Sequence, residues 1–116
     1  MENVPRDNSR PPWDSALALS LVAKRVLIGI NYCDDNDNLL EQKQVYGTII
    51  KADAKEGFAI RLEGQKEGEL FWLPPDIRAF QDAQPGEYRL RSTGEIVVDP
   101  DLITSWTINR PTDRDR

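Results

Sequence analysis

The side chains that could do chemistry in this sequence are few, because none of its 116 residues is a histidine. The chain therefore lacks the usual general base, the base that activates serine and cysteine nucleophiles, and the commonest metal ligand. The remaining candidates are carboxylate pairs such as Glu67 and Glu69, which share a turn with Lys66. Catalysis by two carboxylates needs a cleft that holds them, and a solvated turn does not provide one. The sequence thus predicts a protein that is not an enzyme and uses no cofactor.

The sequence also offers no complete set of metal ligands. Its single cysteine, Cys33, cannot form an internal disulfide or a thiolate zinc site and is interpreted as a buried or half-buried structural side chain. Residues 34–38, DDNDN, supply oxygen ligands. In an EF-hand loop that opened on this run, however, Leu39 would replace the glycine and Val45 the bidentate glutamate. Because Asp and Asn also favour turns, the run is interpreted as a turn.

Composition and charge bound the class of protein and of partner. The chain is 39% hydrophobic and 30% charged, with a formal net charge of -5, which is ordinary for one small globular domain. An acidic surface disfavours phosphate backbones and suits a basic protein partner, although mild acidity is also common among proteins without one. Residues 16–23 are too short an apolar run for a membrane span and match a signal peptide poorly. We therefore expect a cytoplasmic protein.

The periodicity of apolar residues predicts a mainly β domain at residues 13–109, between polar tails at 1–12 and 110–116 that we expect to be disordered. A helix is predicted within residues 15–23, although Leu17, Leu19 and Leu21 also alternate as a strand would. Alternation and turn residues predict strands at 25–32, 39–52, 57–62, 69–73, 87–91, 95–98 and 102–109, and a helical or 3₁₀ turn at 76–80.

The stretch from residue 44 to 76 carries the clearest pattern, three consecutive antiparallel strands. Gly47 lies where a bend or a close backbone approach would need a glycine. In the strand at 57–62, alternation places Phe58, Ile60 and Leu62 on the core side and Ala59 and Arg61 outward.

This order of elements resembles the Sm-like fold, within the SH3-like small barrels. Residues 21–28 resemble the helix-to-strand junction of that family, with Ala23 where a glycine is usual. The spacing of the family's first motif, G-x-[LIV]-x(3)-D-x(3)-N-x(2)-L, is kept by Gly47, Ile49, Asp53, Gly57 and Ile60. The resemblance implies a single small barrel of five to seven strands, with a short N-terminal helix and a 3₁₀ turn after the fourth strand. The segments LPPD and PGEY also look like markers of a small bacterial family without an assigned role.

The same resemblance weakens an RNA-binding function. Gly57 stands where the first motif has the asparagine that holds an RNA base, and the second motif, an Ile-Arg-Gly-like segment, has no counterpart. If RNA were nevertheless bound, the contacts would come from Lys51, Lys55, Gly57, Phe58 and Arg61. A solvated surface of mixed charge is the favoured interpretation of those residues.

The favoured hypothesis is a non-catalytic module that binds a protein partner or a second copy of itself. Candidate contact residues are Tyr46, Phe71, Trp72, Pro74, Pro75 and Asp76. Alternation along the strand turns Phe71 and Trp72 to opposite faces, so one of them is a candidate for exposure, whereas burial of both is the bland alternative. Self-association through edge strands stays open, and an Sm-like RNA-binding protein and a small carboxylate enzyme are the second and third hypotheses.

Overall fold

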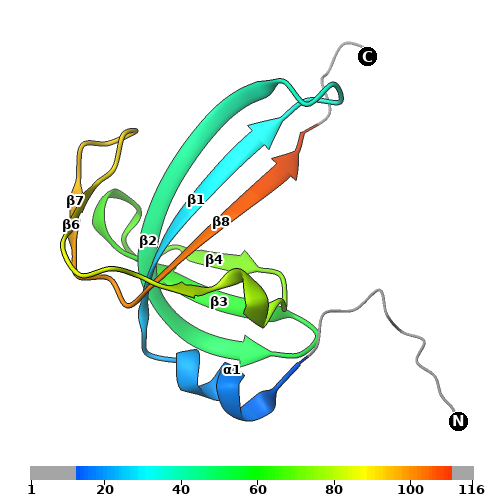
Figure 1. Cartoon of the computed structure of the whole chain (residues 1–116), viewed down its shortest axis with the longest axis vertical. Coiled ribbons are helices and arrows are strands. Elements are labelled where there is room, and N and C mark those ends of the chain that lie inside the picture. The colour runs from blue at the N-terminus through cyan, green and yellow to red at the C-terminus, as the bar shows by residue number, and fades with distance from the viewer. Residues whose placement is uncertain (1–12, 111–116) are drawn as a thin grey trace, which may run out of the picture.

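The structure, a computed structural model, describes residues 13–110, and these form a mainly β chain with one short α-helix (Figure 1). The elements in order are α1 (Ser15–Leu21), β1 (Arg25–Cys33), β2 (Leu39–Asp53), β3 (Gly57–Leu62), η1 (Gly64–Lys66), β4 (Leu70–Leu73), η2 (Ile77–Ala79), β5 (Gln81–Asp82), β6 (Glu87–Arg89), β7 (Ile96–Val98) and β8 (Leu102–Asn109). Every predicted strand is confirmed with bounds that differ by at most two residues, and β5 is an addition. The tails expected to be disordered lie outside the described residues, except Arg110.

The segment before β1 is a helix, which settles the alternative that the sequence left open. Asp14 caps it, because its Oδ1 accepts a hydrogen bond from the backbone N–H of Leu17 at 3.1 Å. One face of α1 buries Ala18 and Leu21 against the sheet, while Leu17 stays exposed. The alternating leucines therefore mark exposed and buried helix positions, and they do not form a strand.

Six strands form the main sheet, in the order β4-β3-β2-β1-β8-β5, and β6 and β7 form a separate hairpin. Neighbours in the main sheet are antiparallel except β1 and β8, which run parallel. The expected closed barrel is not formed, because the edge strands β4 and β5 do not pair with each other. Both edges are short: Pro74 and Pro75, which cannot donate ladder bonds, follow β4, and β5 pairs with only the first two residues of β8.

The main core lies on one face of the curled sheet and follows the alternation of its strands. Val26, Ile28 and Ile30 point from β1 to the same face as Phe58 and Ile60 of β3, and all five are buried. The core-side prediction for β3 is confirmed, and Arg61 is exposed as expected.

Ala59 lies on the face away from the main core, as alternation predicted, but it is not exposed there, since only 2% of that residue is accessible. The strand register places Ala59 between Lys51 of β2 and Trp72 of β4. The Lys51 ammonium lies 6.0 Å from the centre of the Trp72 ring. The Lys51 and Trp72 side chains therefore shield the methyl group of Ala59 from solvent.

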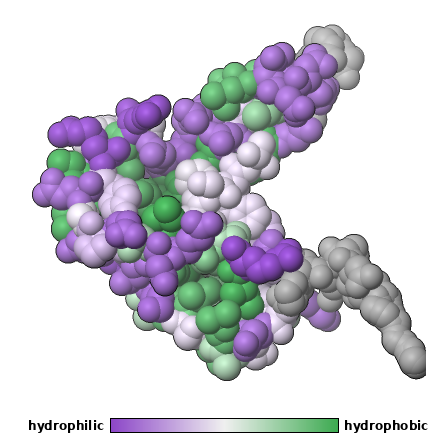
Figure 2. Space-filling view, viewed as in Figure 1, coloured by the Kyte–Doolittle hydropathy of each residue, from purple (hydrophilic) through white to green (hydrophobic). Residues whose placement is uncertain are grey.

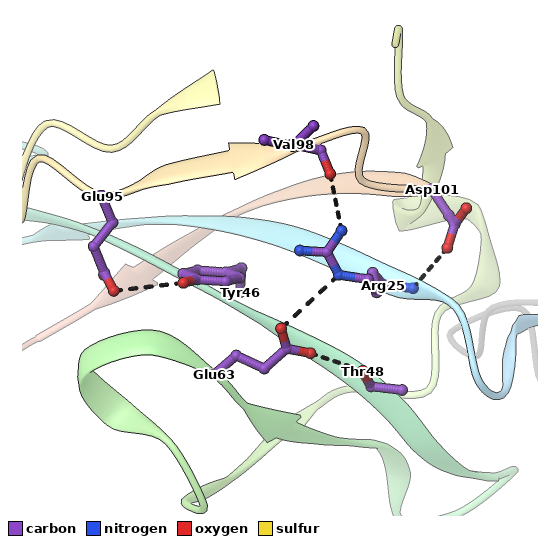
Figure 3. A network of polar contacts seen from close by, with 7 residues as sticks. All are labelled: Arg25, Tyr46, Thr48, Glu63, Glu95, Val98 and Asp101. Carbon is purple, nitrogen blue, oxygen red and sulfur yellow. Dashed lines mark hydrogen bonds and ion pairs between the residues drawn. The ribbon is translucent and has the colours of Figure 1, made fainter. Parts of the chain in front are cut away.

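A second, smaller core lies on the other face of β1, under the β6–β7 hairpin. It consists of Leu27 of β1 with Leu90 and Val97 of the hairpin. Figure 3 shows the polar contacts beside it: Arg25 donates to the carbonyl oxygen of Val98 at 2.9 Å and lies 3.9 Å from the carboxylate of Glu63. These contacts fasten the hairpin to the start of β1.

Two glycines allow backbones to come close where the sheet curls. A Cβ on Gly47 would overlap the carbonyl oxygen of Arg61, as the predicted close approach requires. Gly57 has a φ of +101°, and a Cβ there would overlap the carbonyl oxygen of Leu73. A glycine at position 57 is therefore required by the backbone of this fold.

The outer halves of β1, β2 and β8 project from the rest of the sheet as an arm, defined here as residues 30–44 and 105–110 (Figure 1). The molecule measures 53 × 42 × 24 Å. At the tip of the arm, Asp34 Oδ1 accepts hydrogen bonds from the backbone N–H groups of Asn36 and Asn38, which confirms the predicted turn. The rest of the described chain is called the body.

Candidate functional site

A groove of about 400 Å³ separates the arm from the body, and Figure 2 shows the surface hollowed between these two parts. We name it the β4–β8 groove. Its lining residues come from β1, β4 with the proline that follows it, and β8: Ile30, Phe71, Trp72, Leu73, Pro74, Trp106, Thr107 and Ile108. None of these eight side chains is charged, so the groove suits an uncharged, largely apolar surface.

Strand alternation presents large side chains to this groove. Along β8, Leu102 and Thr104 are buried within the body. Trp106 and Ile108 lie on the same face of the strand, farther along in the arm. Since the body does not reach that far, Ile108 is 40% exposed and Trp106 only half-buried. From the other side, β4 contributes Phe71 and Leu73, which share the core-side face. Trp72, which is 43% exposed, points to the opposite face of β4, where it meets Lys51.

The backbones on both sides of the groove are edges of one sheet. In the described residues β4 pairs only with β3, and β8 pairs beyond β1 only with β5, through Leu102 and Ile103. The backbone N–H of Arg110 donates to Cys33 of β1 at 2.7 Å. Successive residues of a strand direct their N–H and C=O groups to opposite sides. Because Arg110 points to β1, the N–H and C=O groups of Ser105 and Thr107 point away from β1, toward the unpaired edge.

This unpaired edge carries none of the features that usually protect an exposed strand. Residues 105–109, SWTIN, contain no proline and no charged side chain, and their register with β1 is continuous. The 3₁₀ turn η2 reaches β8 only at Thr104, whose Oγ1 donates a hydrogen bond to the carbonyl oxygen of Ala79 at 2.8 Å, and no strand of the described residues pairs with the edge beyond it. The outer half of β8 is thus left open to another strand.

Trp106 adds an unsatisfied donor at the groove. Its Nε1 is buried and has no hydrogen-bond partner within residues 13–110. A buried donor without an acceptor typically costs about 1–3 kcal/mol of stability. The structure thus holds an apolar groove lined by a tryptophan whose N–H group is buried and without a partner in the described residues.

Of the predicted contact residues, the structure brings together Phe71, Trp72 and Pro74 in the groove. Phe71 packs against the main core while Trp72 is exposed, so the two residues divide as alternation predicted. Pro75 and Asp76 follow the groove segment but do not line it. Asp76 instead holds η2 in place and pairs with the Arg78 guanidinium, which raises the pKa of Arg78.

Tyr46 lies on a different face and does not reach the β4–β8 groove. Its hydroxyl donates a hydrogen bond to Glu95 Oε2 at 3.4 Å beside the β6–β7 hairpin (Figure 3). Burial, together with the negative charges of Glu95 and Glu63, raises the pKa of Tyr46 above its usual 10.0. Tyr46 therefore belongs to the contacts that fasten the hairpin.

The residues predicted for RNA contact do not form one exposed surface, because some of them are buried. Phe58 is fully buried against Trp13 and Phe80, with ring centroids 5.5 and 4.8 Å away, so it has no free face on which a base could stack. Gly57 is also buried, beside Leu73.

The basic members of that set do not form one positive strip. The ammonium of Lys51 lies 3.5 Å from the carboxylate of Glu56. Asp53 accepts hydrogen bonds from the backbone N–H groups of Glu56 and Lys55, and these bonds lower the pKa of Asp53. Arg61 is exposed. Acidic groups thus interrupt the basic ones along this surface.

Five groove residues are not among the candidate contact residues: Ile30, Leu73, Trp106, Thr107 and Ile108. Alternation along residues 102–109 places Ile108 on the face of Trp106, which is a usable signal. The pairing of β8 with β1 and its position opposite β4 have no local signal, because both are tertiary contacts.

Residues 13–110 contain neither a metal-ligand cluster nor a membrane-spanning helix. This part of the chain brings no three histidine, cysteine, aspartate or glutamate residues together in a group that could hold a metal ion. Its one α-helix is too short to cross a membrane.

Comparison with known proteins gives no functional assignment. No protein-family model matches this chain, and no similar protein was found among curated sequences or solved structures.

Proposed function

We propose that this protein is a non-catalytic binding module and that its partner is an extended segment of another protein, held in the β4–β8 groove. The observation that carries the proposal is the position of an uncharged groove between two unpaired edges of one sheet. Large side chains at such a site, above all Phe71 and Trp106, are the residue types that dominate protein interfaces.

The chemistry of the groove favours a polypeptide over a nucleic acid. Binding to a phosphate backbone draws its affinity from lysine and arginine, and the lining of the groove contains neither. The net charge of -5 opposes phosphate further and attracts a basic partner. A polypeptide can instead use both the apolar lining and the unpaired peptide groups of the edges.

We also propose that the fold is an opened relative of the Sm-like small barrels. The antiparallel order β1-β2-β3-β4, the preceding helix α1 and the 3₁₀ turn η2 after β4 support this proposal. The parallel pairing of β1 with β8 is the one feature of the sheet that this proposal does not account for. An experimental structure in which β8 left β1 and paired with β4 would favour the closed form.

The functional proposal is tested by selecting binders from a displayed library of random twelve-residue peptides on the purified protein. The groove variant is Ile108→Lys, and the matched control is Ile96→Lys, which changes an isoleucine of similar exposure, 45% against 40%, on the other sheet. We expect enriched peptides whose binding falls at least about tenfold with Ile108→Lys, because a buried unpaired charge is costly. Binding should be unchanged with Ile96→Lys.

Two outcomes would contradict the proposal. The first is a selection from which no peptide is enriched. The second is a set of peptides that bind wild type and Ile108→Lys equally. If immobilised protein retained single-stranded RNA in a salt-dependent way and no peptide, the RNA-binding hypothesis would take its place.

A further inference from the structure

We infer that the partner segment binds as an added β-strand along the free edge of β8, and that the Trp106 indole N–H donates to an oxygen of that segment. This inference rests on the proposed function and specifies how the groove is used. It is carried by two independent observations, the unprotected edge of β8 and the orphaned Nε1 of Trp106.

The edge defines the form of the occupant. Residues 105–109 span about 16 Å at the usual rise of about 3.3 Å per residue, long enough to pair a strand of average length. The peptide groups of Ser105 and Thr107 point to the free side of this edge. Only an extended backbone offers N–H and C=O groups at the same spacing, so a helix or a sugar would leave these groups without partners.

Trp106 supports an occupant that brings hydrogen-bond acceptors into the groove. Its Nε1 is shielded in the free protein and unsatisfied. An added strand supplies carbonyl oxygens along its whole length, and a turn of the indole toward the groove brings the N–H to one of them. The donor that weakens the free protein then stabilises the complex.

The composition of the remaining chain makes its own tails poor occupants. The first twelve residues, MENVPRDNSRPP, contain three prolines and only one aliphatic residue beyond Met1. The last six residues, PTDRDR, begin with proline and contain no aliphatic residue. Proline cannot donate to a ladder, and charged side chains do not fit an uncharged groove.

The lining of the groove defines the chemistry of the proposed partner segment. Its groove-facing residues are uncharged and apolar, to match the lining of the groove. β-Branched residues suit it because they favour extended backbone. Lysine or arginine beside the segment would be attracted by the acidic body, whose charge is spread outside the groove.

The test of strand addition uses the peptides selected on the groove, resynthesised with N-methyl groups on every second amide, in two complementary series. N-Methylation removes main-chain donors and leaves the side chains in place. We expect at least one series to lose about tenfold or more in affinity, because its methyl groups face β8. If both series bind like the parent peptides, the inference is wrong while the proposed function stands.

A variant pair in the protein tests the same contact from the other side. Thr107→Pro removes one donor from the free edge and leaves the ladder to β1, whereas Thr107→Val keeps that donor and is the matched control. We expect weaker peptide binding with Thr107→Pro only. Equal binding by both variants contradicts the inference, and the methylated peptides decide it if Thr107→Pro does not fold.

Trp106→Phe tests the indole donor, since it removes the N–H and keeps an aromatic ring. We expect a higher urea midpoint for the free protein and a severalfold weaker affinity for the selected peptides. A purely structural defect would give the higher midpoint with unchanged affinity, and that result would overturn the role of Trp106. A dimeric mass by light scattering that the peptides reduce to a monomer would identify a second copy as the natural occupant and overturn the assignment to another protein.

Discussion

Strands β1, β2 and β8 run through both the body and the arm, but the two parts differ in which elements cover these strands. In the body, β1 buries Val26 and Ile28 on one face and Leu27 on the other, under α1, β3 and the β6–β7 hairpin. In the arm, the same strand continues its alternation to Tyr32 and Cys33, both only half-buried. Alternation therefore decides which face a residue takes, and the neighbouring elements decide whether that face is buried.

The comparison also explains why the groove lies where it does. Curling of the sheet brings β4 across from β8 in the body, but the arm runs on beyond the reach of β4 and β5. The apolar pattern of β8 extends past the point where the body can cover it. The uncovered part, with Trp106 and Ile108, forms one wall of the groove.

The largest expected contrast is between core residues of the body and apolar residues of the arm. Phe58→Ala should lower the free energy of unfolding by about 3–5 kcal/mol, because it leaves a cavity beside Trp13 and Phe80. Leu40→Ala in the arm should change it by less than about 0.5 kcal/mol, since that side chain is exposed. Urea denaturation measures both values. A loss of similar size for the two variants would mean that the arm is covered in solution.

Gly57→Ala should lower the free energy of unfolding by about 3 kcal/mol, from the combined positive φ and overlap with the carbonyl of Leu73. Gly68→Ala is the control, because Gly68 also has a positive φ, +92°, with no atom near its Cβ position. It should lose only about 1 kcal/mol. Equal losses, measured by thermal or urea denaturation, would show that the body does not require close contact between β3 and the end of β4.

In the arm, the largest local effect is expected at Arg110. Its guanidinium lies 4.2 Å from the ring centre of Tyr32 and 3.2 Å from the carboxylate of Glu41. Arg110→Gln should lower the free energy of unfolding by about 0.5–1 kcal/mol, and salt should reduce the difference. Lys55→Gln, at an exposed turn of the body, is the control and should have almost no effect. An effect of Arg110→Gln above about 2 kcal/mol would imply that the arm is more buried than this structure shows.

The smallest effect concerns pH and the contacts that fasten the hairpin. The pKa of Tyr46 is raised in the folded protein, so the folded state holds this proton more tightly than the unfolded chain does. Its contribution is present below the unfolded pKa of about 10 and is lost as the pH rises through the folded pKa. Tyr46→Phe should therefore lose less stability between about pH 9 and pH 11 than wild type. Parallel losses in urea titrations would exclude this role for Tyr46.

Much of the fold could be predicted because its signals are local. Period-two alternation indicates the strands, and the Asp and Asn residues indicate the turn at residues 34–38. The preceding prolines and Asp76 indicate the η2 turn. The burial of Ala59 was missed because it depends on Lys51 and Trp72, which contact it only across the sheet. β5 was missed because two residues are too few to show a period.

The candidate site could be predicted only in part, and for the same reason. Phe71, Trp72 and Pro74 were proposed from their residue types, and the structure places them in one groove. Tyr46 and Phe58 have equally suitable types, but one fastens the hairpin and the other fills the core. Residue type indicates what a side chain can do, and position in the fold decides where it is free to act.

The sequence was sufficient to determine the mainly β class, the bounds of every strand except β5 to within two residues, the face of each alternating residue and the lack of histidine chemistry. These properties depend on residues adjacent in the chain and on composition. The parallel pairing of β8 with β1, the open sheet and the groove between β4 and β8 depend on contacts between segments far apart in sequence. Such contacts are chosen by the packing of the whole chain, so only the tertiary structure could place Trp106 at the wall of a groove.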